Sequence, residues 1–182
     1  MKQAILKLAR ESIKNYLETG QILTRPANLP HKLLQKQAGV FVSLHLRSDH
    51  SLRGCIGTFL PVRKNLAEEI IHNAIAAASQ DPRFPPVALR EFGNLEIAVD
   101  ILSPPKMIAK EFRPDRPLPA ILDARKFGLI VSAGNGRKGL LLPDIPGVKS
   151  PSEQIKICLA KAGISNREKV NLEIFTVLRY SS

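Results

Sequence analysis

The sequence has no tryptophan, only two cysteines, and no apolar run near the roughly 18 residues of a membrane-spanning helix. Cys55 and Cys158 lie far apart, which fits neither a zinc-ligand spacing nor a dense disulfide framework. The four histidines show no His-Glu-x-x-His or paired Cys/His pattern, so we expect no metal and no cofactor. Charged residues interrupt the N-terminal segment, which therefore lacks the apolar stretch of a secretory signal. These absences predict a cytoplasmic protein that does not enter membranes.

Negative charge is also scarce, because 27 Lys and Arg residues face only 16 Asp and Glu, a formal net charge of +11. Such an excess attracts polyanions. The basic residues are nevertheless spread along the chain in short groups, and two tyrosines offer little surface on which bases could stack. We therefore favour a basic surface without a nucleic-acid role, and we keep nucleic-acid binding as a less favoured alternative.

The apolar pattern predicts one domain spanning residues 1–182, in which helices and strands alternate. Helical spacing of apolar residues indicates a helix over residues 3–18, and strict alternation indicates a strand from Val40 to Leu46. The polar run "RSDHS" should then turn the chain back into an antiparallel hairpin. The remaining elements are expected to be helices at 65–79 and 150–163, strands at 95–101 and 170–176, a strand pair within 127–143, and connectors at 21–37 and 106–120. This order predicts an α+β fold with a mostly antiparallel sheet flanked by helices.

Two features have simple structural explanations. The run "GNGRKG", residues 134–139, matches the letters of the dinucleotide-binding fingerprint, but "LLLP" follows it and cannot form the helix that this fingerprint requires. We therefore interpret the run as a hairpin turn, whose tip residues Arg137 and Lys138 could still touch an anion. Cys158 lies on the apolar face of the predicted late helix and should pack as a core residue.

The octet "LRGCIGTF", residues 52–59, is the least ordinary stretch of the chain. In one interpretation Cys55 is a reacting thiol, because Arg53 lies two positions away on the same face of a strand and could lower its pKa. In the other, Gly54 and Gly57 make room for the alanine-rich helix at 65–79, and Cys55 only fills space. The residues alone favour neither interpretation.

A hairpin that pairs Leu46 with Leu52 would place Ser43 opposite Cys55 and His45 opposite Arg53. His45 would then lie diagonal to the thiol. A slip of one residue would move His45 to the other face of the sheet and remove this arrangement.

The octet, followed by "DPRFPPV" and by a strand ending in "ILSPP", resembles the AMMECR domain family, which is named after a chromosomal region linked to a human syndrome. The runs "AGVFVSL", "FGLIV", "GLLLP" and "CLAKAGI" occur in the family's order, so the resemblance covers about residues 38–165. The signature positions that it implies are Leu52, Arg53, Gly54, Cys55, Ile56 and Gly57, with Asp81, Pro82, Arg83, Phe84 and Pro85 in the second motif. His45 is not part of the motif. Many relatives have a tryptophan after the "LLP" strand, where this chain reads "DIPGVKSPSEQ".

The resemblance implies an α+β domain with an antiparallel sheet and two unequal lobes that face a cleft. Short members of the family are described as component A of a set that also contains a Memo-like protein and a radical S-adenosylmethionine enzyme, so these are the implied partners. No settled reaction is implied.

These arguments lead to two main hypotheses. The first is a binding or accessory module that receives a peptide, a partner protein or a small anionic ligand in a cleft, with candidate residues Gly54, Gly57, Thr58, Asp81, Arg83, Phe84 and Pro85. The second is an enzyme or enzyme component in which Cys55 is a nucleophile or covalent carrier and Arg53 or Arg83 holds an anionic group. We favour the first, because the residues supply no complete set of acid, base and nucleophile.

Overall fold

The computed structural model describes residues 1–181, which divide into two compact units. The first comprises Met1–Leu102 and the chain from Leu178 onward, and the second comprises Ser103–Val177. The family resemblance implied unequal lobes, and the first unit is the larger. Within residues 1–181, no helix combines the length and the apolar character that crossing a lipid bilayer requires.

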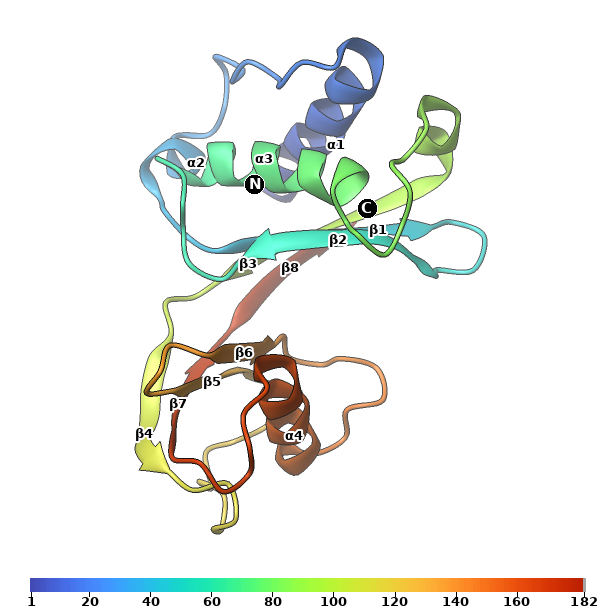
Figure 1. Ribbon diagram of the computed structural model, residues 1–182. Helices are drawn as coiled ribbons and strands as arrows, with labels where there is room; N and C mark the ends of the chain where they lie inside the picture. The colour runs from blue at the N-terminus through green and yellow to red at the C-terminus, as the bar shows by residue number, and fades with distance from the viewer. Residues whose placement is uncertain (182) are drawn as a thin grey trace. The chain divides into compact units, whose positions relative to one another are not determined.

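The first unit contains a four-stranded sheet in the order β2-β1-β3-β8, with helices on one face (Figure 1). β1 pairs antiparallel with both β2 and β3. Its elements are α1 (Lys2–Thr19), α2 (His31–Gln35), β1 (Val40–Leu46), β2 (Leu52–Thr58), α3 (Leu66–Ser79), the 3-10 helix η1 (Leu89–Asn94), β3 (Leu95–Leu102) and β8 (Val177–Ser181).

The predicted alternation places one face of this sheet against the helices. Val40, Val42 and Leu44 of β1 are fully buried and join one core with Leu8 of α1 and Ile70 of α3. Asn65 begins α3, because its side chain accepts a hydrogen bond from the Glu68 backbone N–H. Burial of the apolar stripes of α1 and α3, rather than helix propensity, therefore holds both helices on the sheet.

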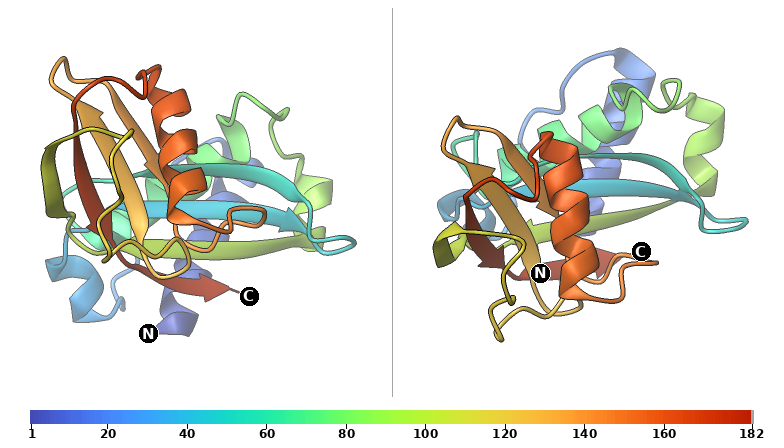
Figure 2. Two further views of the ribbon diagram at one scale, coloured as in Figure 1. Left: turned by 90° about the horizontal axis from the view of Figure 1, so that it is seen from below. Right: turned by 60° about the horizontal axis from the view of Figure 1, so that its bottom comes forward.

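The second unit has a sheet in the order β4-β7-β5-β6, and α4 packs beside its β5–β6 hairpin (Figure 2). Its elements are β4 (Lys106–Phe112), β5 (Gly128–Ala133), β6 (Lys138–Leu141), α4 (Pro151–Ala162) and β7 (Val170–Phe175). α4 begins with a capping box, since Ser150 and Glu153 exchange side-chain and backbone hydrogen bonds. Cys158 is buried as predicted, and burial raises the pKa of its thiol to about 12.

The hairpin interpretation of "GNGRKG" is confirmed. β5 and β6 pair antiparallel around it, and Gly136 adopts a left-handed φ of 84° that the turn requires. Arg137 bonds to the Gly163 carbonyl and to Glu168. This arginine therefore fixes the end of α4.

The expected linker at 106–120 is wrong for its first half, because residues 106–112 form β4. This strand is an exposed edge with charged side chains and two irregularities in its pairing with β7. Its apolar alternation is correspondingly weak, so periodicity could not reveal it. The strand expected at 170–176 also ends earlier, at Phe175, and β8 follows at once in the other sheet.

The expected connector at 21–37 contains the short helix α2, whose only buried residue is Leu33. The segment between "DPRFPPV" and β3 forms η1, which has no buried residue. Helices this short and exposed leave no hydrophobic period in a sequence.

Candidate functional site

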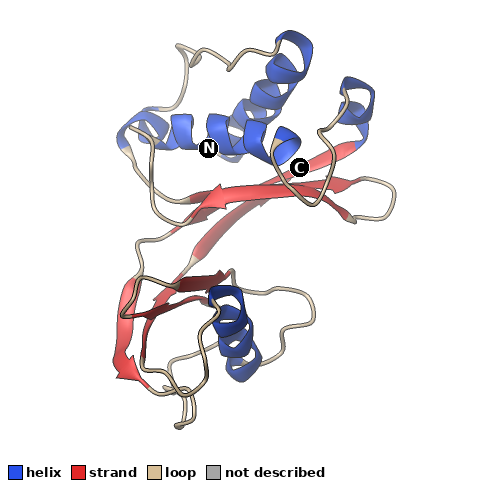
Figure 3. Ribbon diagram, viewed as in Figure 1, coloured by secondary structure: helices blue, strands red, loops and turns tan. Residues whose placement is uncertain are grey.

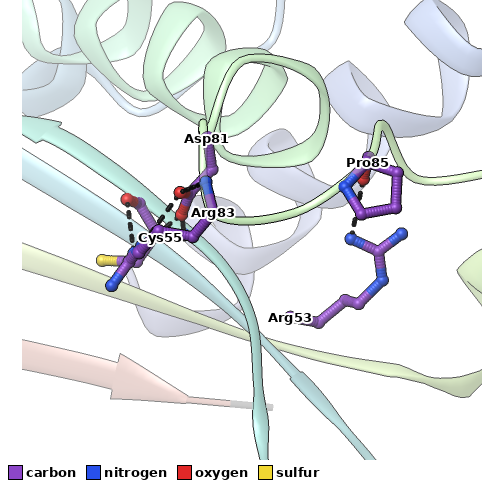
Figure 4. Close-up of polar contacts among 5 residues, drawn as sticks. All are labelled: Arg53, Cys55, Asp81, Arg83 and Pro85. Carbon is purple, nitrogen blue, oxygen red and sulfur yellow. Dashed lines mark hydrogen bonds and ion pairs between the residues drawn. The ribbon is translucent and has the colours of Figure 1, made fainter.

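The two signature motifs meet at the outer side of β2, which is an edge strand of its sheet. The loop of residues 80–88, drawn in tan in Figure 3, runs from the end of α3 down to this edge and back to η1. The Cys55 backbone N–H donates to Asp81 Oδ2 over 2.8 Å, and Arg83 Nη2 donates to the Cys55 carbonyl at 3.5 Å (Figure 4). We call the set of Cys55, Asp81, Arg83 and Arg53, with the Arg53 partners Glu91 and Pro85, the β2-edge junction.

Asp81 is the buried anchor of the β2-edge junction. Its carboxylate accepts two hydrogen bonds from Arg83, of 2.9 Å from Nε and 2.7 Å from Nη2, and a third from the Arg83 backbone N–H. Because of the Arg83 guanidinium, the pKa of Asp81 lies well below its ordinary 3.8, and the pKa of Arg83 is raised in turn. The Asp81 side chain is only 3% exposed, whereas that of Arg83 is 56% exposed. The pair therefore presents a fixed guanidinium at the surface.

Arg53 occupies a β-bulge, and this corrects the register expected from the sequence. Ser43 lies opposite Cys55 as predicted, but the pairing shifts after Leu44, so that His45 lies opposite Leu52 rather than Arg53. A bulge commonly redirects a side chain. The sequence led us to expect Arg53 and Cys55 on the same face of a regular strand. The bulge interrupts the strand at Arg53, so this expectation does not hold.

The Arg53 guanidinium is directed to the loop rather than to the Cys55 sulfur (Figure 4). Its Nε and Nη2 atoms fork onto Glu91 of η1 at 3.1 and 3.2 Å, and Nη1 donates to the Pro85 carbonyl at 3.0 Å. The Arg53 side chain is 11% exposed, and its hydrogen bonds hold the pKa of Glu91 below its ordinary value. Arg53 therefore binds the far end of the proline-rich loop to β2.

Arg83 lies close enough to Cys55 for their charges to interact. Cys55 is half-buried. The pKa of Arg83 is raised mainly by Asp81, and the charge of Cys55 makes the smallest contribution in the same direction. Phe84, also half-buried, lies beneath the Arg83 guanidinium, with 5.5 Å between the guanidinium carbon and the ring centre. Thiol, guanidinium and ring are thus brought together by the two motifs.

The glycines of the octet allow close packing on both sides of β2. A Cβ atom at Gly54 would lie 2.2 Å from the carbonyl oxygen of Ala77 in α3, so this glycine makes room for the helix. At Gly57 it would lie 2.3 Å from the ring of Phe41. Neither strand position can accept a larger residue without a shift of its neighbours.

Thr58 belongs to a buried polar network that was not predicted from the sequence. Its hydroxyl donates to Glu69, which also accepts the backbone N–H groups of Val62 and Arg63 at 2.9 Å each. Asn73 donates to the Thr58 hydroxyl at 3.2 Å. Glu69 is 1% exposed. Its carboxylate interrupts an otherwise apolar stripe of the helix, and this pattern could have indicated a buried polar network. Glu91 gave no such signal, because its role depends on the long-range contact with Arg53.

The chemistry available at the β2-edge junction is recognition of a negative group. The outward side of Arg83 could fork onto a carboxylate or a phosphate. Among residues 1–181, no group of three or more His, Cys, Asp or Glu side chains is placed to hold a metal ion.

Comparisons with known proteins identify relatives of the whole chain. A family model described as AMMECR1 matches residues 6–182. A protein of Thermotoga maritima is 48% identical over 176 residues, which cover 96% of this chain and 95% of the relative. A protein of Clostridium acetobutylicum is 42% identical over 180 residues, which cover 98% of this chain but 36% of the relative. The crystal structure of an uncharacterized protein from Pyrococcus horikoshii is similar, with a TM-score of 0.84, 36% identity, and coverage of 96% of this chain and 88% of that one.

Proposed function

The chain belongs to the AMMECR1 family, and from that premise we propose that it is a cytoplasmic binding or accessory module, acting as one domain through the β2-edge junction. The observation that carries this proposal is the mutual engagement of the signature side chains. Asp81 is bound by Arg83 and by the Cys55 backbone, and Arg53 is bound by Glu91 and Pro85. Groups held in this way set the shape of a surface, whereas a general acid or base needs a proton that it can exchange near neutral pH.

The partner that we propose is a protein or peptide with an acidic group that reaches Arg83. Phe84 and Pro85 would supply apolar contact beside this charge, a combination common at interface centres. The Clostridium relative supports an accessory role, because the matched region makes up only 36% of that longer protein. A Memo-like protein and a radical S-adenosylmethionine enzyme are the candidate partners that family membership suggests.

Calorimetric titration against a Memo-like protein and a radical S-adenosylmethionine enzyme from the same genome tests the proposal. Arg83→Ala and Phe84→Ala should each weaken binding about tenfold or more, in the range of interface hot spots. Cys55→Ser should change the affinity less than about twofold, because a packed cysteine is replaced by a residue of similar size. Unchanged affinity in both Arg83→Ala and Phe84→Ala would refute docking at this surface.

A second candidate function, thiol chemistry at Cys55, is favoured by one observation, the position of Arg83 beside the thiol. A guanidinium stabilises a thiolate and thereby increases reactivity. Iodoacetamide labelling across pH is the test: a Cys55 that reacts faster than free cysteine at neutral pH, and loses this advantage in Arg83→Ala, would support the enzyme hypothesis. Labelling no faster than free cysteine would exclude it.

A further inference from the structure

A hollow of about 440 Å³ lies beside β2, which contributes Ile56 and Thr58 to its lining. It is bordered by the end of α1, by α3, and by the segment that joins β2 to α3. We call it the α1–α3 groove, and its lining residues are Tyr16, Gly20, Ile22, Ile56, Thr58, Val62, Arg63, His72, Asn73, Ile75, Ala76 and Gln80. Ile56 and Thr58 come from the octet, but the charged residues of the β2-edge junction are not part of the groove.

The walls of the groove expose apolar side chains that a solvated surface does not require. Ile22 is 53% exposed and Val62 is 67% exposed, and Leu60, next to the groove in sequence, is 45% exposed. Ile56 and Ile75 continue the apolar lining toward the core. Exposed apolar side chains that gather around a hollow are typical of a site for a ligand or a partner.

The polar groups of the groove fall into two classes. Two lining residues, Thr58 and Asn73, are engaged in the network around Glu69. In contrast, across residues 1–181, no hydrogen bond or ion pair engages the side chains of four other lining residues: Tyr16, Arg63, His72 and Gln80. Four polar side chains that remain available in one apolar hollow are suited to orient a bound molecule.

The charge of the groove is positive and is concentrated at Arg63. Burial lowers the pKa of His72, Arg63 lowers it further, and Glu68 and Glu69 oppose this effect. Both acidic groups are already engaged, Glu68 by Asn65 and Glu69 by Thr58 and two backbone N–H groups. Arg63 is therefore the charge that a ligand would meet, with a neutral imidazole nearby.

We infer that the α1–α3 groove is a docking site for a segment of a partner protein that carries a carboxylate next to apolar side chains. The carboxylate would pair with Arg63 and accept hydrogen bonds from Tyr16 or Gln80, while the apolar side chains pack against Ile22 and Val62. Charge complementarity selects an acidic segment. This inference is independent of the β2-edge junction, since no charged residue is shared between the two.

A titration followed by amide NMR tests the inference with a capped peptide of alternating Leu and Asp. Backbone signals at Ile22, Val62 and Ala76 should shift, with an affinity of about millimolar, as expected for a short unstructured ligand. The matched peptide of alternating Leu and Asn should bind at least about fivefold more weakly, because it lacks the charge.

Two substitutions in the protein test the same inference. Arg63→Glu should weaken binding of the Leu/Asp peptide at least about fivefold, because like charges then meet. Val62→Asp should do so as well, and its exposure makes the substitution tolerable to the fold. Arg167→Glu, an exposed position in the second unit that changes the net charge equally, is the matched control and should leave the affinity within about twofold.

Three results would overturn the inference: no shifts at millimolar peptide, equal binding of the Leu/Asp and Leu/Asn peptides, or equal losses in Arg63→Glu and Arg167→Glu. A short RNA that shifts the same signals more strongly than the peptide would assign the groove to nucleic acid instead. Arg83→Ala should not alter the peptide titration, so failure of the proposed function at the β2-edge junction remains distinguishable.

Discussion

The β2-edge junction and the α1–α3 groove both adjoin the same strand, yet Asp81 and Arg53 at the junction are in the opposite state from Arg63 and His72 in the groove. At the junction, Asp81 is buried, Arg53 is largely covered, and both are engaged by partners within the chain. In the groove, Arg63 and His72 have no such partners within residues 1–181. The difference teaches that a conspicuous motif can serve mainly to build a surface, while residues without any motif remain available for binding.

The two states also predict different consequences of substitution. Removing one member of a buried, hydrogen-bonded pair leaves the other unsatisfied, which destabilises the fold. Removing an exposed, unengaged side chain leaves stability nearly unchanged and affects only what binds to it. Variants of the two regions should therefore separate into losses of stability and losses of affinity.

The largest effect is expected for Gly54→Ala, which changes the strand that both regions share. The added Cβ atom would meet the Ala77 carbonyl at 2.2 Å, so α3 must move away from β2. Such overpacking should reduce the free energy of unfolding by about 3 kcal/mol, measured by urea denaturation. Gly93→Ala is the control, since nothing lies within 4 Å of its Cβ position. Equal stability of the two variants would contradict the close packing of β2 and α3.

Asp81→Ala should have the next largest effect, about 2 kcal/mol of unfolding free energy, because the half-buried Cys55 N–H loses its acceptor. The exposed Arg83 can turn into water, which limits the cost. The folded-state pKa of Asp81 lies below the ordinary 3.8, so its contribution is present above that value and is lost as the pH falls below it.

Urea denaturation of the wild type and of Asp81→Asn from about pH 6 to about pH 3 measures this contribution. The wild type should lose more stability over that range than the variant does. Parallel pH profiles would show that Asp81 is not the titrating group.

Arg53→Lys should cost about 1 kcal/mol, because an ammonium cannot fork onto Glu91 and reach the Pro85 carbonyl together. The same urea experiment measures it, with Arg63→Lys in the groove as the matched control. The control should be indistinguishable from wild type. A comparable loss in Arg63→Lys would erase the proposed contrast between the regions.

The smallest effect concerns His72, whose pKa should lie below 6.5 because of burial and the nearby Arg63. NMR titration of the imidazole measures it directly. Arg63→Gln should raise this pKa, since a positive neighbour disfavours the imidazolium. Replacement of Arg83, in the other region, should leave it unchanged, and a shift there would argue against separate sites.

Much of the first unit could be predicted from local patterns in the sequence. The alternation of Val40, Val42 and Leu44 predicted β1 and its buried face, and Ser43 lies opposite Cys55 as in the register assumed for the hairpin. Burial of one face produces a regular spacing of apolar residues, so the buried helices and strands could be predicted from the sequence. β4, α2 and η1 bury little and were missed for the same reason.

The candidate site was only partly predictable. The resemblance brought Cys55, Asp81 and Arg83 together, and the structure joins them by hydrogen bonds. The Glu91 partner of Arg53 could not be predicted, because Glu91 is distant in the sequence, and no local pattern indicated the bulge at Arg53. The groove could not be predicted from a motif, since only Ile56 and Thr58 come from the octet and its other residues lie in separate segments that share only a place in the fold.

The position of Asp81 and Arg83 along β2 also bears on how copies of this protein behave toward one another. An unpaired strand edge is a template for the addition of a strand from another molecule, which leads to aggregation. Here Asp81 and Arg83 occupy the N–H and the carbonyl of Cys55, and the charged, proline-rich loop cannot itself extend the sheet. The second signature motif thus blocks the addition of a strand at the middle of this edge.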